Sequence, residues 1–556
     1  MSRRRSPYFL GVIGIACLLI AAIVWHGRSI VSAQAPRYDL LIRNGTVVDG
    51  TGGPGVRADV AVTGDTIVAL APGVTAAARR TIDAQGLVVA PGFIDMHTHS
   101  DSSLIEDGRA ASFLMQGVTT ELLGEHTSAG PILGKAERGI FSLTEDAKTK
   151  APAPDWTTLG GYFKKLEARG ISINVASYVG SGQVRACVVG YENRPATPDE
   201  LEQMKTLVAD AMRDGAVGLS SGLAYVPNIY ATTDELTALA RVAAEHGGFY
   251  GTHLRGGTRE DQLAGLKEAL AIAEGAKAPL EIIHVNSTAG GRIGEFAALI
   301  EAARARGLDI TANFYPYTAG MSFLRSLLPA WAQEGGTEAM LARLRNPEDR
   351  ARIQQTLGQS DPARWQRTYV SSTNRAIDGK TIADLAAARQ VEPAVALMDI
   401  VLEEGGYAFY ISFGNTEENL KKGMVLPWVH FGSDGAAVTI DTFKGGKPHP
   451  RFFGTFARVL GKYVREERAL TLEQAVHKMT LLSARRLGFD DRGQIAIGRK
   501  ADLVVFDPQT VTDRATFENP LQYATGVQYV LVNGTVVVDK GAHTGAKPGR
   551  VLRHKG

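Results

Sequence analysis

Apolar and polar residues alternate at both ends of the chain, and Gly and Asp turns interrupt the alternation. Residues 36–93 hold three such segments, and residues 491–556 hold two more. A period of two with many β-branched residues predicts short strands. The two regions also share the pentapeptide NGTVV, at residues 44–48 and 533–537. We therefore predict one small β-sandwich domain that both regions build together.

The intervening residues, 94–490, show a different rhythm, in which short apolar runs are followed by Ala-, Leu- and Glu-rich helical segments such as residues 197–215. Eight alternating strand and helix units predict an α/β fold, a (β/α)8 TIM-like barrel. The eight candidate strands are residues 93–99, 119–126, 173–180, 216–223, 249–255, 281–286, 310–317 and 429–435.

The alternation changes between the last two candidate strands. Residues 328–427 form a long, mostly helical stretch that includes the sequence DGKTIADLAAARQ. We predict an insertion here, in a position suited to a lid over the strand ends.

The first 35 residues have the layout of a secretory signal. They combine a basic start, an apolar run from Phe9 to Trp25, and a small–x–small end at Ala33–Ala35. As a helix the run would be about 25 Å long, slightly short of the ~30 Å hydrocarbon layer. We expect cleavage after Ala35, with an uncleaved signal anchor as the alternative. Either form predicts an exported protein, periplasmic or extracellular, that contacts the membrane only if this segment is retained.

Composition narrows the functional classes. The chain has 556 residues and a formal net charge of only +2, with no basic block outside its N-terminus. A nucleic-acid partner is therefore not expected. Of the two cysteines, only Cys187 lies outside the signal-like segment, so no intrachain disulfide is expected. These features do not predict an oligomeric state.

Metal-capable side chains gather at the predicted strand ends. His97 and His99 end the first strand, and residues two apart on a strand point the same way. In a barrel of this kind the strand ends meet at one mouth, where chemistry takes place. The other metal-capable residues at strand ends are Glu125, His126, His253, His284 and Asp434.

These residue types suit a zinc site. Zn²⁺ takes imidazole nitrogen and carboxylate oxygen. A single histidine on a strand is more often an ordinary hydrogen-bonded residue, but a pair with several further donors at strand ends predicts one or two metal ions. Asp434 is suited to act also as a general base. The ordinary structural interpretation is kept for His246, His430, His477 and His543.

Several motifs resemble a known family. The chain is similar to the amidohydrolase superfamily and, within it, to the N-acyl-D-amino-acid deacylases, also called D-aminoacylases. The resemblance runs from Asp39 to Gly541 and implies a barrel of the metal-dependent hydrolase type. The motifs that carry it are PGFIDMHTHSD, THLRGG, IIHVN, FGSDG, RPATPDELEQM, GAVGLSSGLAYVP, FYPYTAG and HPRFFGTFARVLG.

The resemblance implies a zinc hydrolase that cleaves the amide of an N-acylated D-amino acid. It implies that His97, His99, His253 and His284 bind zinc and that Asp434 is the catalytic acid and base. Arg451 matches an arginine that pairs with the substrate carboxylate, and Tyr315 matches a substrate-contacting tyrosine.

The chain departs from the family pattern at four positions. Where a Cys ligand is usual after the second strand, this chain has His126, with Glu125 before it. A carboxylate bridges two metals better than an imidazole does, so we favour Glu125 as the bridge, with His126 as a terminal ligand as the alternative. In the substrate pocket, a family Lys is Asn286, a Ser is Met321 with Ser322 beside it, and a His is Ser181.

The expected function is therefore hydrolysis of a linear amide, most specifically deacylation of N-acyl-D-amino acids, with one or two Zn²⁺ ions. A dipeptidase or another amidase of the same superfamily is the alternative, because the substrate pocket differs at Asn286 and Met321. A non-catalytic exported binding protein is a third hypothesis.

Overall fold

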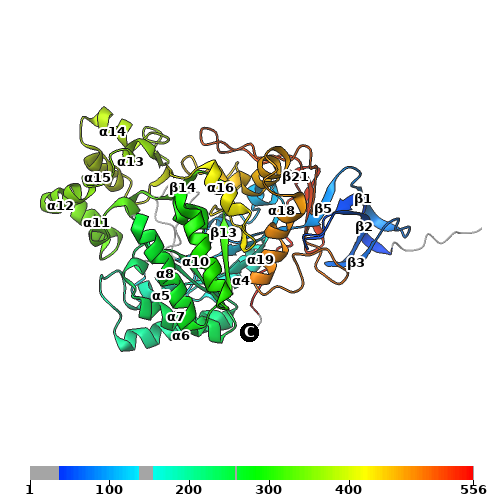
Figure 1. The fold of residues 1–556 in the computed structure, drawn as a ribbon, viewed down its shortest axis with the longest axis horizontal. Helices are drawn as coiled ribbons and strands as arrows, with labels where there is room; N and C mark the ends of the chain where they lie inside the picture. Colours follow the sequence, from blue (N-terminus) through cyan, green and yellow to red (C-terminus); the bar gives the residue numbers. More distant parts are fainter. Residues whose placement is uncertain (1–36, 137–153, 257–258, 555–556) are drawn as a thin grey trace, which may run out of the picture.

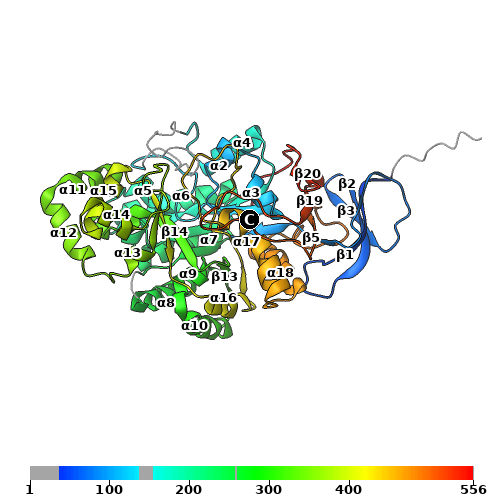
Figure 2. The same cartoon turned by 90° about the horizontal axis from the view of Figure 1, so that it is seen from above.

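The structure is a computed structural model, and it describes residues 37–136, 154–256 and 259–554. The predicted signal peptide or signal anchor, residues 1–35, lies outside the described residues. Within the described ranges, no helix has both the length and the apolar character that a membrane span requires. The molecule is elongated, with strands from both ends of the chain at one end of the long axis and the helices of residues 337–403 at the other (Figure 1 and Figure 2).

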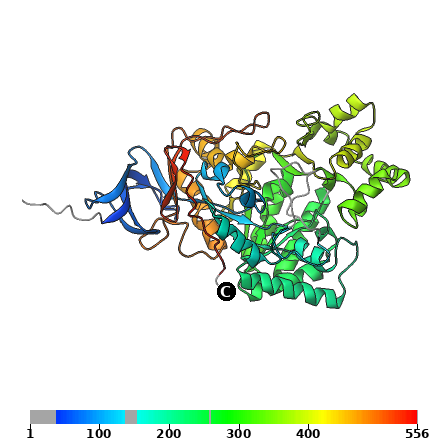
Figure 3. The ribbon, with the colours of Figure 1, turned by 180° about the vertical axis from the view of Figure 1, so that it is seen from behind.

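One sheet combines strands from both ends of the chain, which lie side by side in Figure 3. Strands from the two ends meet where Ala90 pairs antiparallel with Val504. The apolar residues of the alternating pattern face a common core that includes Leu40, Val60 and Leu503. The strands are β1 (Tyr38–Val47), β2 (Val56–Thr63), β3 (Thr66–Ala71), β4 (Ala78–Asp83), β5 (Val88–Pro91), β18 (Leu503–Phe506), β19 (Val527–Val532), β20 (Thr535–Asp539) and β21 (Ala542–His543).

Parallel strands occupy the middle of the molecule in two sheets, of order β6-β7-β8 and β9-β10-β11-β12-β13-β17. Only Tyr178 separates β8 from β9 in the chain, and at the other edge the Met96 amide donates to the Phe431 carbonyl at 3.2 Å. Each of the eight predicted runs overlaps at least one of these strands, and the run 173–180 includes both β8 and β9. The predicted run 281–286 shares only its first two residues with β12, so His284 lies beyond the strand. The strands are β6 (Phe93–Asp95), β7 (Val118–Leu123), β8 (Asn174–Ser177), β9 (Val179–Gly180), β10 (Gly218–Gly222), β11 (Phe249–His253), β12 (Leu280–Ile282), β13 (Ile310–Phe314) and β17 (Val429–Phe431).

Amphipathic helices follow these strands, and α6 shows why the sequence forms them. Thr197 and Glu200 make a capping box at its start, and it ends at Gly215, whose φ of 111° suits glycine. The helices around the parallel strands are α2 (Ser103–Glu106), α3 (Ala111–Leu114), α4 (Leu159–Arg169), α5 (Ser181–Val188), α6 (Pro198–Asp214), η1 (Asn228–Tyr230), α7 (Thr233–Glu245), α8 (Arg259–Ala276), α9 (Val285–Ala289), η2 (Gly290–Arg292), α10 (Ile293–Ala305), α16 (Glu417–Met424), α17 (Arg451–Arg458), η5 (Val459–Glu466), α18 (Leu472–Met479) and α19 (Leu481–Arg486).

The region between β13 and β17 has a core of its own, which includes Leu344 and Leu397. It is tied to the rest of the molecule by hydrogen bonds from Ser371 Oγ to the Lys447 carbonyl (2.7 Å) and from Tyr230 to Ala330 (2.7 Å). Its elements are β14 (Ala319–Phe323), η3 (Leu324–Leu327), η4 (Ala330–Gln333), α11 (Thr337–Arg345), α12 (Pro347–Leu357), α13 (Arg364–Arg367), β15 (Thr368–Ser371), α14 (Ile382–Arg389), α15 (Pro393–Glu403) and β16 (Phe409–Phe413).

After β21 the chain leaves the mixed sheet and runs along β8. The Val175 amide donates to Arg550 O (2.9 Å), and the Leu552 amide donates to Val175 O (2.7 Å). Farther on, the His554 amide donates to Gly215 O. Residues 550–554 thus lie near the starts of β8 and β10, opposite the strand ends where the metal-capable side chains lie.

Candidate metal centre

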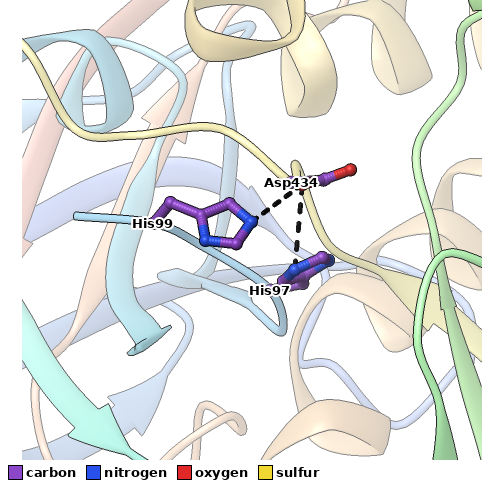
Figure 4. Close-up of side chains that lie close together, drawn as sticks. All are labelled: His97, His99 and Asp434. Carbon is purple, nitrogen blue, oxygen red and sulfur yellow. Dashed lines mark hydrogen bonds and ion pairs between the residues drawn. The ribbon is translucent and has the colours of Figure 1, made fainter. Parts of the chain in front are cut away.

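His97, His99 and Asp434 form a compact cluster at the ends of β6 and β17 (Figure 4). One ligand atom from each lies within 4.8 Å of the others. Asp434 Oδ1 is 3.1 Å from His99 Nε2 and 3.8 Å from His97 Nε2. Gly432 permits this close approach of the two segments, since a Cβ there would lie 3.0 Å from the His97 Cβ.

His284 and His253 extend the cluster into a row of imidazoles. The His284 ring lies 5.3 Å from the His97 ring and 4.5 Å from the His253 ring, centroid to centroid. Glu125 lies in the segment after β7, with Oε2 at 4.0 Å from His99 Nε2. Side chains from β11 and from the segments after β6, β7, β12 and β17 therefore lie near one another, around the cluster of His97, His99 and Asp434.

Three residues at these strand ends have left-handed backbone conformations, with φ of 62° at His126, 36° at His284 and 54° at Asp434. Non-glycine residues rarely adopt this conformation, and it clusters at functional sites. Each amide has a partner: the His126 amide donates to Ser220 Oγ, the His284 amide to Asn313 Oδ1, and the Asp434 amide to the His97 carbonyl.

The donor set fits a metal ion such as Zn²⁺. Within the described part of the chain, both ring nitrogens of His97, Nδ1 of His284 and Oε1 of Glu125 are buried without hydrogen-bond partners. Buried polar atoms are normally paired, so these atoms point to a ligand. Burial lowers the pKa of His284 to about 4 and also lowers that of His97, which keeps both imidazoles neutral at pH 7. Burial raises the pKa of Glu125 to about 8, as expected for a carboxyl without a cation.

Glu125 and His126 point to different surroundings. Glu125 faces His99, whereas the His126 ring packs 5.3 Å from the Tyr225 ring. The His126 side chain also fills the space that side chains at Gly182 and Gly222 would need, since a Cβ at either position would come within 2.6 Å of it. The geometry therefore favours Glu125 over His126 as the neighbour of His99.

Arg451 lies beside Asp434, with Nη1 at 2.9 Å from Asp434 Oδ2. Burial alone raises the pKa of Asp434, but Arg451, His97 and His99 outweigh that effect and hold it well below its usual range. The Arg451 guanidinium is only 3% exposed and lies 4.9 Å from the centre of the Tyr315 ring. Asp434 is therefore ionised at pH 7.

The remaining residues predicted to contact the substrate have the following partners. Asn286 Oδ1 accepts the Tyr315 amide (3.2 Å), and its Nδ2 is buried without a partner among the described residues. Ser322 Oγ lies 2.9 Å from the Tyr225 hydroxyl, and Tyr225 packs on His253. Ser322 is therefore linked to His253 through Tyr225. Ser181 donates to Asn228.

Sequence reasoning missed Asp95 and Asn313. Asp95 Oδ1 accepts the amides of His97 (3.2 Å) and Ser433 (2.8 Å), so it joins the end of β6 to the segment that carries Asp434. The available signal was a charged residue inside the apolar run FIDMHTH. Asn313 carried no such signal, because an Asn in a strand is unremarkable until its partner is known.

Buried neutral imidazoles with carboxylates at the ends of parallel strands define the metal site of a hydrolytic enzyme class. Residues 80–538 match the model of the amidohydrolase family. The D-aminoacylase of Alcaligenes xylosoxydans xylosoxydans is 36% identical over 93% of this chain and 97% of its own length. The N-acyl-D-glutamate deacylase of the same organism is 35% identical over 93% and 97% of the two chains.

Solved structures of related enzymes have the same fold as this chain. A crystal structure of D-aminoacylase has a TM-score of 0.77 at 34% identity and covers 93% of this chain and 100% of that chain. The N-acyl-D-glutamate deacylase of Bordetella bronchiseptica, complexed with zinc and a phosphonate mimic of the tetrahedral intermediate, has a TM-score of 0.76 at 32% identity over 93% and 100%. The chain belongs to the amidohydrolase family and has its fold, which confirms the predicted resemblance.

Proposed function

We propose that this protein is a zinc-dependent deacylase of N-acyl-D-amino acids. The observation that carries the proposal is the convergence of unpartnered buried nitrogen and oxygen atoms beside an ionised Asp434. The names of the relatives, D-aminoacylase and N-acyl-D-glutamate deacylase, together with an N-acyl-D-aspartate deacylase at 33% identity, support this substrate class. These enzyme names also argue against the non-catalytic binding protein.

The architecture that we propose for this activity is a (β/α)8 barrel over residues 94–490, with a mostly helical insertion at 328–427. A β-sandwich domain of residues 36–93 and 491–556 completes it. The parallel strand order and the hydrogen bond from Met96 to Phe431 support closure of the barrel. Export through residues 1–35 is part of the same proposal and rests on the sequence pattern.

We assign one or two zinc ions to His97, His99, His253, His284, Glu125 and Asp434, and keep His126 as the alternative ligand. The orphaned ring nitrogens of His97 and the orphaned oxygen of Glu125 support this donor set. When bound, zinc lowers the pKa of water at the site toward ~7 and polarises a carbonyl oxygen.

The protein's own groups then have separate tasks. The Asp434 carboxylate accepts a proton from the attacking water and delivers it to the amide nitrogen as the C–N bond breaks. The products are a carboxylate and a free D-amino acid. Arg451 binds the substrate carboxylate, because its Nε is buried without a partner among the described residues and a guanidinium binds carboxylates with two parallel bonds. Tyr315, whose ring lies 4.9 Å from the Arg451 guanidinium, and Asn286, which accepts the Tyr315 amide, are the other proposed substrate contacts.

A second candidate function is cleavage of a dipeptide or another linear amide at the same site. It is favoured by the neutral Asn286, whose buried Nδ2 offers a hydrogen bond where the family pattern has a cation. Such a pocket tolerates a substrate group that carries no negative charge.

Turnover of paired D and L N-acetyl amino acids, dipeptides and lactams by purified protein tests the proposal. The protein is first stripped with a chelator and then assayed with and without added Zn²⁺. We expect zinc-dependent release of D-amino acids and much slower release of the L-isomers. Turnover that survives complete metal removal contradicts the proposal of a zinc-dependent deacylase. Turnover of dipeptides alone also contradicts it.

A further inference from the structure

The backbone amide of His284, which has a left-handed conformation, donates to one side chain, Asn313. The φ and ψ of His284 are 36° and 57°, and it is the residue directly before α9. Asn313, on the neighbouring strand β13, accepts the His284 amide through Oδ1 at 2.7 Å. Loss of this bond leaves a buried amide at a strained position without that partner. The direction of the His284 imidazole therefore depends on Asn313.

Glu281 determines which way the Asn313 amide group faces. The Asn313 Nδ2 donates to Glu281 Oε1 at 3.0 Å. A backbone amide only donates, so the oxygen of Asn313 faces His284 and its NH₂ faces the Glu281 oxygen that accepts from it. The two bonds thus specify one orientation of an amide group that otherwise has two.

Glu281 is fixed in turn by neighbours on three elements. His430 Nε2 on β17 lies 2.8 Å from its Oε1, and Thr311 on β13 donates to its Oε2. Arg486 on α19 donates to the Thr311 hydroxyl at 2.6 Å. Asn313, Glu281 and His430 are each 0% exposed. Water therefore cannot replace a lost partner easily, and the network is rigid.

We propose that Asn313 is a positioning residue for His284, oriented by the Glu281–His430 pair, and that this network sets the zinc affinity of the site. The proposal rests on the proposed function, since it requires His284 to be a zinc ligand. Partners that orient ligands typically contribute 10–100-fold to metal affinity.

The test compares Asn313→Leu with Asn174→Leu in the full-length protein. Asn174 is an equally buried strand residue, and it bonds Asp502, Asn533 and the Arg550 amide at the other end of the parallel strands. Zinc affinity of the chelator-stripped proteins is measured by competition with a chromogenic chelator, and thermal unfolding is measured without metal. We expect zinc affinity to fall by about 10- to 100-fold in Asn313→Leu. Asn174→Leu should lose thermal stability but keep wild-type zinc affinity.

Reversing the polarity of the pair gives a second test that does not depend on tolerance of leucine. Asn313→Asp keeps an oxygen that accepts the His284 amide, but it replaces the NH₂ that donates to Glu281 with a second acceptor oxygen. Adding Glu281→Gln restores a donor opposite that acceptor, so the double variant should regain zinc affinity lost by Asn313→Asp. Wild-type affinity in both Asn313 variants overturns the inference. A wild-type protein that neither binds zinc nor releases D-amino acids overturns the proposed function instead.

Discussion

Removing the Arg451 guanidinium should abolish the preference for substrates with a free α-carboxylate. The guanidinium is buried, its Nη1 faces Asp434, and its Nε has no partner among the described residues. A substrate carboxylate about 4 Å away at an effective dielectric constant of ~20 gains about 4 kcal/mol. Two charge-assisted hydrogen bonds at 1.5–3 kcal/mol each give a similar figure. Since 1.4 kcal/mol is a factor of ten, the expected loss is about a thousandfold.

The assay compares kcat/KM for an N-acetyl-D-amino acid with that for its carboxamide, in wild type and in Arg451→Met. Loss of Arg451 also alters Asp434, but both substrates use the same Asp434, so this effect cancels in the ratio. Arg458→Met is the matched control, because Arg458 ends the same helix and pairs with Asp513. We expect the acid-to-amide ratio to fall about a thousandfold in Arg451→Met alone. A ratio that stays at the wild-type value refutes carboxylate binding by Arg451.

Three further outcomes are expected. Asp434→Asn should lower kcat by about 10³-fold with an unchanged circular dichroism spectrum, since proton transfer contributes 10²–10⁴-fold; near-wild-type kcat excludes the acid–base role. Glu125→Gln should reduce zinc content by elemental analysis, whereas His126→Gln should not, and the reverse pattern would make His126 the ligand. Because the pKa of Glu125 is raised from 4.5 to about 8 in the metal-free protein, that protein should lose stability as pH rises from about 4.5 to 8. The free energy of unfolding, measured with denaturant across this pH range, should fall in wild type and fall less in Glu125→Gln. An equal fall in both proteins contradicts this prediction.

Much of the fold could be predicted because its elements are specified locally. Each parallel strand is a short apolar run followed by a helix with its own cap, as Thr197 and Glu200 show for α6. The pairing of β5 with β18 and the course of the last residues along β8 could not be predicted. Those contacts join residues far apart in the chain, and no local pattern records the partner of a strand.

Some residues of the candidate site could likewise be predicted from the sequence, whereas their contacts could not. Strand alternation predicted His97 and His99 on one face of a strand, and the strand-end rule predicted Asp434 beside them. In the structure β6 ends at Asp95, so both histidines lie in the segment after it, and one ligand atom of each lies within 4.8 Å of the others and of one from Asp434. The ion pair between Arg451 and Asp434 was not expected, because the resemblance implied only a substrate partner for the arginine. The left-handed turn at His284 also escaped prediction, since it depends on a side chain of the next strand.

The junction of β5 and β18 has a consequence for protein synthesis. The first strands leave the ribosome early, but β18 is translated only after the whole set of parallel strands. Until β18 is made, the edge of β5 that pairs with it has no partner, and unpaired strand edges associate with other chains. Premature termination before Leu503 is therefore expected to give insoluble fragments rather than a shorter active enzyme.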